Sequence, residues 1–200
     1  MIKRMKLIDV FSIDYNNGKG FTKKDYVSRG YCGALHSGDI GRNTEITLEE
    51  PKTFINCSVY SENVKAYKNE IIVKIEDFGL DYLLKAVLYK GEVPIAVTPK
   101  TLILETYGQF IDLIDLEYIV IQLNYGKRIR EFVKKHATGT KVMRISKASL
   151  KELEIDIPPL EEQKRIATIY KTWSISIENL GKNKELTQEY KNKYIGDLFK

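Results

Sequence analysis

The 200-residue sequence predicts an α+β protein, with a globular domain built on a curved, mainly antiparallel sheet and several helices, followed by a long C-terminal coiled-coil helix. Three observations predict this fold class. Short segments rich in Ile, Val, Leu and Tyr alternate with Asn, Gly and Pro between residues 54 and 106, as strands alternate with turns. Apolar residues with helical spacing follow over residues 112–136. Residues 160–199 continue this spacing and contain no proline.

Four segments are expected to form the strands of the sheet. Their apolar and polar residues alternate imperfectly, as expected where both faces of a sheet are partly covered. The segments are residues 54–60, 70–76, 82–89 and 94–106. Residues 31–43 precede them, read YCGALHSGDIGRN, and are expected to form turns because they are rich in glycine.

Two helices are expected after the strands, over residues 112–123 and 127–136. The second helix should turn Ile129, Phe132 and Val133 inward. Its other face is basic and carries Lys127, Arg128, Arg130, Lys134 and Lys135, against Glu131 alone. Gly139 then suits a left-handed cap, and Ser146 suits the N-cap of a further short helix.

The chain changes character at Pro158 and Pro159. Residues 153–157 alternate apolar and acidic side chains, as a half-buried strand does, and proline ends such a strand because it donates no backbone hydrogen bond. Glu161 and Glu162 follow in a first helical turn, where the helix dipole favours negative charge. We therefore expect a globular domain at residues 1–158 and a helical arm at residues 159–200.

The expected arm carries an apolar stripe with spacings of three and four residues, which is typical of a helix that packs along another helix. At the usual rise per residue the arm would be roughly 60 Å long. Gly181 costs about 1 kcal/mol relative to alanine, so a bend or a hairpin at this residue is the alternative. The residues expected to mediate dimerisation are Ile166, Ile169, Tyr170, Trp173, Ile177, Leu180, Tyr190, Tyr194 and Leu198.

Composition narrows the cellular compartments and the classes of partner that are expected for the protein. The net charge of +5 and the pI of about 8.9 are mildly basic and permit a nucleic-acid partner. Cys32 and Cys57 show no C-x-x-C spacing and are expected to be a reduced, buried pair, which fits a cytosolic protein. The N-terminus lacks the apolar run of a signal peptide, and no segment approaches the length of a membrane span. A cytoplasmic protein is expected.

Catalytic motifs are weak. Asp156, Glu162 and Lys164 superficially match the acidic pair and lysine of a metal-dependent nuclease. Such enzymes place both carboxylates on facing strands that share Mg²⁺, whereas here the E-x-K lies in a first helical turn. His36 and His136 have no further ligand at the spacing of a zinc site. We therefore expect no catalytic residue, no metal and no cofactor.

A family resemblance lies between residues 137 and 177. This stretch contains T-G-T at residues 138–140, I-x-I-P at residues 155–158 and L-x-E-Q-x-x-I-A at residues 160–167. It resembles the specificity subunits of type I restriction-modification systems, in which a strand, a proline pair and such a helix follow each target recognition domain. Before residue 137 only fragments fit, such as SGDI at residues 37–40.

The resemblance implies a non-enzymatic subunit that recognises double-stranded DNA and directs methyltransferase subunits, and possibly restriction subunits, to a target. This chain has one recognition domain and one helical region, so it looks like a half-size subunit that would form a homodimer through the arm and read a bipartite inverted repeat. A coiled-coil scaffold without specific DNA binding and an autonomous nuclease remain the alternatives.

The candidate DNA-binding residues come from two basic clusters and the neighbouring loops. Lysine and arginine would hold phosphates, while loop side chains would reach base edges. The candidates are Lys19, Lys23, Lys24, Arg29, Tyr31, Arg42, Asn43, Lys127, Arg128, Arg130, Lys134, Lys135, Thr138, Gly139, Thr140 and Lys141.

Overall fold

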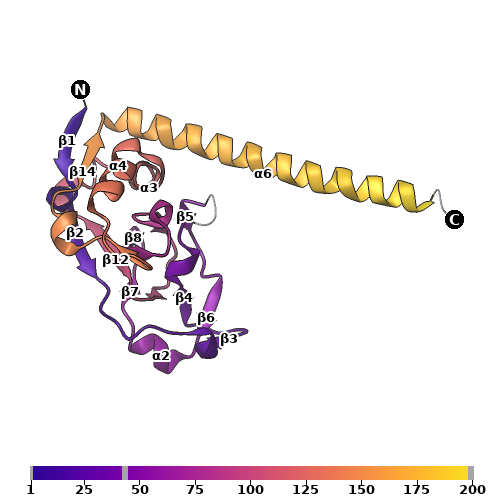
Figure 1. Cartoon of the computed structure of the whole chain (residues 1–200), viewed down its shortest axis with the longest axis horizontal. Helices are drawn as coiled ribbons and strands as arrows, with labels where there is room; N and C mark the ends of the chain where they lie inside the picture. The colour runs from indigo at the N-terminus through magenta and orange to yellow at the C-terminus, as the bar shows by residue number, and fades with distance from the viewer. Residues whose placement is uncertain (1, 42–44, 198–200) are drawn as a thin grey trace.

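The computed structural model describes residues 2–41 and 45–197, except for the side chains of residues 183 and 185–197. Figure 1 shows a globular domain from which one long helix, α6 (Leu160–Asp197), projects to one side. The predicted fold class is confirmed, since strands and short helices form the domain and the long helix ends the chain. The 38 residues of α6 give it a length of about 57 Å.

A five-stranded sheet forms the centre of the domain, in the order β2 (Phe11–Tyr15), β12 (Thr101–Thr106), β8 (Ile71–Lys74), β10 (Ala86–Tyr89) and β5 (Thr47–Leu48). Its strand pairs are antiparallel except for β10 with β5. A second sheet has the order β3 (Tyr26–Val27), β6 (Thr53–Ile55), β4 (Gly33–Leu35), β11 (Ile95–Val97) and β7 (Lys65–Ala66), with β11 and β4 parallel.

Two further strand pairs tie distant parts of the chain together. β1 (Lys3–Lys6) pairs antiparallel with β14 (Glu154–Ile157), which places the N-terminal strand beside the start of α6 (Figure 1). β13 (Met143–Arg144) pairs with β9 (Glu76–Asp77). Short helical turns fill the connections between strands: α1 (Leu7–Val10), η1 (Lys23–Asp25), η2 (Ser37–Asp39), α2 (Cys57–Ser61), η3 (Leu80–Tyr82) and η4 (Gly108–Phe110).

Both faces of the central sheet are buried. Ile71, Val73 and Leu102 belong to a core that also contains the inward residues of α3 (Leu116–Tyr125) and α4 (Lys127–His136). Ile72 and Ile103, which alternate with them, belong to a second core shared with residues of the second sheet. This double burial explains why these strands have nearly continuous apolar runs instead of a clean alternation.

The predicted helices are largely confirmed. α4 covers the predicted residues, whereas α3 begins at Leu116 because the carboxylate of Asp115 accepts the backbone N–H of Tyr118 at 2.9 Å and caps it. Ser146 caps α5 (Lys147–Leu150) as predicted, accepting the N–H of Ser149 at 3.0 Å. Gly139 has a φ of +113°, but it lies in a turn beyond the helix cap, where the neighbouring Thr138 bridges to Arg144.

Two of the predicted strands are longer than the observed ones, and a third predicted strand is in fact two strands. The segment at 54–60 leaves the sheet after Ile55, and a helical turn from Cys57 to Ser61 follows. The segment at 82–89 pairs only from Ala86, after η3. The segment at 94–106 forms β11 and β12, separated by a turn in which Lys100 has a φ of +76°.

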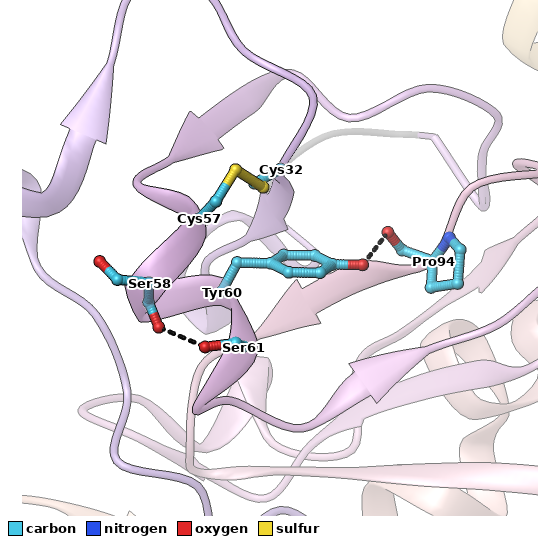
Figure 2. Close-up of a disulfide and its surroundings, with 6 residues drawn as sticks. All are labelled: Cys32, Cys57, Ser58, Tyr60, Ser61 and Pro94. Atoms are coloured by element: carbon cyan, nitrogen blue, oxygen red, sulfur yellow. Dashed lines mark hydrogen bonds between the residues drawn. A yellow bond between two sulfur atoms is a disulfide. The ribbon is translucent and has the colours of Figure 1, made fainter.

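The expectation of two reduced, buried cysteines was wrong. Cys32 and Cys57 form a disulfide, and Cys57 lies on the surface. Figure 2 shows that the bond links the loop before β4 to the first turn of α2. The same helix is fixed by the hydroxyl of Tyr60, which donates to the carbonyl of Pro94 at 2.9 Å. The pairing was missed because 25 residues separate the two cysteines in sequence, while the fold of the second sheet brings them together.

Candidate functional site

The predicted basic face of α4 exists, but its residues differ in availability. Lys134 and Lys135 are exposed, and neither makes an ion pair with the residues that the structure describes. Lys127 lies 3.9 Å from Glu131, and Arg128 lies 3.4 Å from Asp156 on β14. Of the basic residues on α4, Lys134 and Lys135 at its C-terminal end are therefore the most available to an anionic ligand.

Arg130 has a structural role instead. Its guanidinium donates to the backbone carbonyls of Leu123 at 2.7 Å and Leu83 at 2.8 Å, and also to that of Asp81 at 3.2 Å. Burial lowers the pKa of the guanidinium, although Asp81 opposes this effect. Because the side chain joins α4 to η3 and to the end of α3, we remove Arg130 from the candidate DNA-binding residues.

The second basic cluster borders a cleft of about 370 Å³, which we call the His36 cleft. Four separate segments and one further residue line it: residues 19–22, 36–38, 76–78 and 98–100, together with Val142. The cleft thus brings the basic loop at Lys19 close to the end of the T-G-T turn, two regions more than 100 residues apart in sequence. The sequence predicted both regions as DNA contacts but could not predict that they meet.

The remaining candidates of these loops lie mostly on the surface. Lys23, Lys24, Arg29 and the residues 138–141 are exposed, and Tyr31 is 96% exposed. Lys19 is also exposed and lies 3.0 Å from Glu62. Arg42 and Asn43 lie outside the described residues. The structure therefore supplies exposed cations in the segments that line the His36 cleft or adjoin them in sequence.

The first turns of α6 face their own domain. Gln163 is fully buried: its side-chain oxygen accepts the N–H of Asp115 at 2.8 Å, and its amide donates to the carbonyls of Leu113 at 2.9 Å and Pro158 at 2.8 Å. Ala167 is buried beside it in the main core. In the sequence, Gln163 stands out only as part of the L-x-E-Q-x-x-I-A motif. The structure shows that it joins the start of α6 to the loop before α3 by hydrogen bonds.

An ion-pair cluster continues this attachment of α6. Glu117 of α3 lies 2.5 Å from Lys171 of α6 and also pairs with Lys90. Burial alone would raise the pKa of Glu117, but hydrogen bonds from Lys171 and Lys90 hold the pKa below its usual value. The hydroxyls of Tyr125 and Tyr170 are 2.9 Å apart.

Ile166 and Tyr170 belong to this attachment. Both are partly buried and pack against the main core of their own chain. Contacts within the chain therefore already account for the apolar character of both residues, which no longer argues for an interface between two chains. We remove them from the residues proposed to meet a second copy.

The remaining described residues of the stripe are exposed: Ile169, Trp173, Ile177 and Leu180. Trp173, the largest of them, is 67% exposed. These residues lie on one side of α6 because their spacings are four, four and three. The helix runs through Gly181 without interruption, so the hairpin alternative is wrong. The side chains of Tyr190 and Tyr194, and the whole of Leu198, lie outside the described residues.

The two acidic residues of the nuclease motif are engaged in other contacts. Asp156 lies 3.2 Å from Arg4 and 3.4 Å from Arg128, while Glu162 accepts two hydrogen bonds from Arg165 in the first turn of α6. Within the described residues, no three His, Cys, Asp or Glu side chains group closely enough to hold a metal ion. In the same part of the chain, none of the helices is both long and apolar enough for a bilayer crossing.

The geometry defines a class of protein: an α+β domain with exposed basic loops around a cleft, rigidly joined to a projecting helix with an apolar stripe. Residues 2–188 match the family described as the type I restriction modification DNA specificity domain. The chain belongs to this family, as the sequence resemblance predicted.

Solved structures show the same fold. The chain is 18% identical to the S subunit of a type I restriction-modification system from M. genitalium, with a TM-score of 0.61 over 97% of this chain and 44% of that one. It is 16% identical to the HsdS subunit from Thermoanaerobacter tengcongensis, with a TM-score of 0.57 over 91% of this chain and 39% of that one. A structure of a type I R-M system gives a TM-score of 0.59 at 15% identity, over 93% and 41% of the two chains. The chain therefore spans less than half the length of these neighbours.

Proposed function

We propose that this protein recognises a specific sequence of double-stranded DNA and directs the methyltransferase subunits, and possibly the restriction subunits, of a type I restriction-modification system to it. Recognition would be the task of residues 1–158, and residues 159–200 would join two recognition domains and hold the partner subunits. The proposal makes the chain a binding subunit of a cytoplasmic enzyme complex rather than an enzyme.

One observation carries this proposal: the family match extends over residues 2–188 and therefore includes both the domain and most of α6. The arrangement of the chain agrees with it. Basic loops and the end of α4 are exposed on the domain, and the buried attachment of α6 would fix the distance from this domain to whatever the arm binds.

The direct test is to co-express the chain with type I methyltransferase subunits, purify the complex and map methylated bases in the host DNA. We expect methylation at one defined bipartite motif when the chain is present and none when it is omitted. A scaffold without specific DNA binding would copurify with partners but direct no methylation to a defined motif.

The basic end of α4 is proposed to contact phosphates. The double variant Lys134→Glu with Lys135→Glu should weaken binding to all DNA sequences nearly alike, and the slope of log affinity against log salt should fall by about one per lost contact. The measurement is a salt titration of DNA binding by the assembled complex.

The matched control is Lys151→Glu with Lys164→Glu, which changes the net charge equally at two exposed lysines outside α4. This control should keep the salt slope of the unaltered protein. Identical slopes for both double variants would mean that the α4 face is only solvated.

The exposed stripe on α6 is proposed to pack against the same stripe of a second copy. A two-fold pair would cover Ile169, Trp173, Ile177 and Leu180 of both chains, and it would place two recognition domains in one assembly. Large exposed apolar side chains in such a row are typical of an interaction surface.

Trp173→Ala should weaken this dimer by about 30- to 150-fold, corresponding to about 2–3 kcal/mol for a buried interface tryptophan. Sedimentation equilibrium over a range of protein concentrations measures the effect. Ile175 is also exposed but is displaced from the stripe around the helix, so Ile175→Ala is the matched control and should change little. A chain that stays monomeric at high micromolar concentration, with or without Trp173, would contradict the dimer.

A further inference from the structure

The His36 cleft contains a hydrogen-bond donor whose orientation is fixed by the protein. The ring atom Nδ1 of His36 accepts the backbone N–H of Gly38 at 2.9 Å. An imidazole nitrogen that accepts a hydrogen bond carries no proton, so the neutral ring must carry its proton on Nε2. The ring also contacts Phe21 edge-on, with their centroids 6.4 Å apart. His36 lines the cleft and, with Nδ1 occupied, has the Nε2–H as its remaining donor.

The wall behind His36 is anchored to the end of β11 in the second sheet. The N–H of Ser37 donates to the hydroxyl of Thr98 at 2.7 Å. The buried amide of Asn16 donates to the carbonyls of Val97 at 2.6 Å and Thr98 at 3.0 Å. The first bond ties the segment around His36 to the turn after β11, and the bonds of Asn16 fix this turn to the end of β2. A site held this way keeps its geometry when a ligand arrives.

Phe78 borders the same cleft and is 74% exposed. The residue before it is firmly held: Asp77 pairs with the buried Lys74 at 3.0 Å, and its carboxylate accepts the N–H of Gly79 at 3.2 Å. The loop therefore has a fixed base, while its aromatic ring is presented to solvent. Among the described residues, the ring of Phe78 belongs to none of the hydrophobic cores and stacks on no other aromatic ring.

The charges in the cleft are already paired. Lys100 lies 2.9 Å from Glu76, Asp77 pairs with Lys74, and Lys19 lies 3.0 Å from Glu62. A phosphate site needs cations in excess, whereas contacts to base edges need oriented donors, acceptors and apolar groups. The exposed Lys23, Lys24 and Lys141 adjoin the lining segments and could hold the flanking phosphates.

We propose that the His36 cleft receives base edges of the DNA target and that His36 and Phe78 determine specificity there. The Nε2–H of His36 donates to an acceptor on a base edge, such as O6 or N7 of guanine, and the ring of Phe78 makes an apolar contact with a neighbouring base, such as a thymine methyl group. This inference rests on the proposed function and adds to it the position of the reading site and two residues outside the predicted DNA contacts.

The test uses His36→Asn and Phe78→Ala in the complex with methyltransferase subunits. An asparagine oxygen can still accept the N–H of Gly38, because Asx side chains commonly bond the backbone two residues on, but the variant lacks the ring donor. Tyr67→Ala is the control for Phe78, since Tyr67 is an exposed aromatic residue outside the His36 cleft. Methylation is mapped on genomic DNA, and unfolding midpoints are measured for each variant.

We expect each variant to relax the preference at one or two positions of the motif by about 5- to 150-fold, with its unfolding midpoint nearly unchanged, whereas Tyr67→Ala keeps the original motif. If His36 only supports the loop, His36→Asn will keep the motif as well. Original motifs in both folded variants would overturn the inference and leave the proposed function intact. If the unaltered chain directs methylation to no motif, the proposed function fails and the inference fails with it.

Discussion

Replacement of Gln163 by leucine should lower the free energy of unfolding by about 3–5 kcal/mol, although leucine has nearly the same size. The variant would remove the partner of the N–H of Asp115 and of the carbonyl of Leu113, which are partly buried, and of the carbonyl of Pro158, which is buried. Each buried polar group that loses its hydrogen bond costs about 1–3 kcal/mol. Urea denaturation followed by circular dichroism measures the loss.

Two controls separate the role of these hydrogen bonds from other effects. Lys164→Leu makes a similar change at the adjacent, exposed position and should alter the stability by less than about 0.5 kcal/mol. Gln163→Glu keeps the acceptor for Asp115 but removes both donors, so it should be at least as damaging at neutral pH. A loss below about 1 kcal/mol in Gln163→Leu would show that water replaces the amide and that the attachment of α6 depends on apolar packing alone.

The same glutamine explains part of the family motif physically. In L-x-E-Q-x-x-I-A the last three named residues, Gln163, Ile166 and Ala167, all face the domain of their own chain. The motif therefore describes how the arm is attached to the recognition domain, while the exposed stripe begins after it. In the proposed dimer, the angle at which α6 leaves the domain would set the distance between the two domains.

The parts of the fold that local sequence determines were predicted well. The helix at 127–136, the cap at Ser146 and the strand before the two prolines each follow from periodicity and from residues that begin or end such elements. The strands around residues 54–60 and 82–89 were predicted too long. Val59 and Tyr60 of α2 pack against a small core, and Leu83 and Leu84 fill the main core before β10 begins, so their apolar character serves packing outside the strands.

Long-range pairing limited the prediction of the candidate site. Nothing in the basic sequence KRIREFVKKH distinguishes Arg130, which bonds three carbonyls, from Lys134, which is exposed. In the sequence, His36 has the residue type of a zinc ligand but no partner at ligand spacing, and Phe78 belongs to no recognisable motif. Their common cleft arises from segments that the two sheets bring together, and local periodicity carries no information about such contacts.

Reduction of the Cys32–Cys57 disulfide should lower the free energy of unfolding by about 3 kcal/mol. The bond joins positions 25 residues apart, and closing a loop of this length removes conformational entropy from the unfolded chain. The expected measurement is a urea midpoint that falls when a dithiol reductant is added. The double variant Cys32→Ser with Cys57→Ser should show the lower midpoint with or without reductant.

Reduction should first loosen the structure around the two cysteines. The disulfide joins the loop that carries Tyr31 to the start of α2. Both adjoin strands of the second sheet, β4 and β6, outside the main core that packs against α3, α4 and α6. Hydrogen exchange should therefore increase in residues 28–35 and 56–61 before it increases in α3. Equal midpoints for the oxidised and reduced protein would contradict the expected stabilisation, and an increase that begins in α3 would contradict the separation of the two cores.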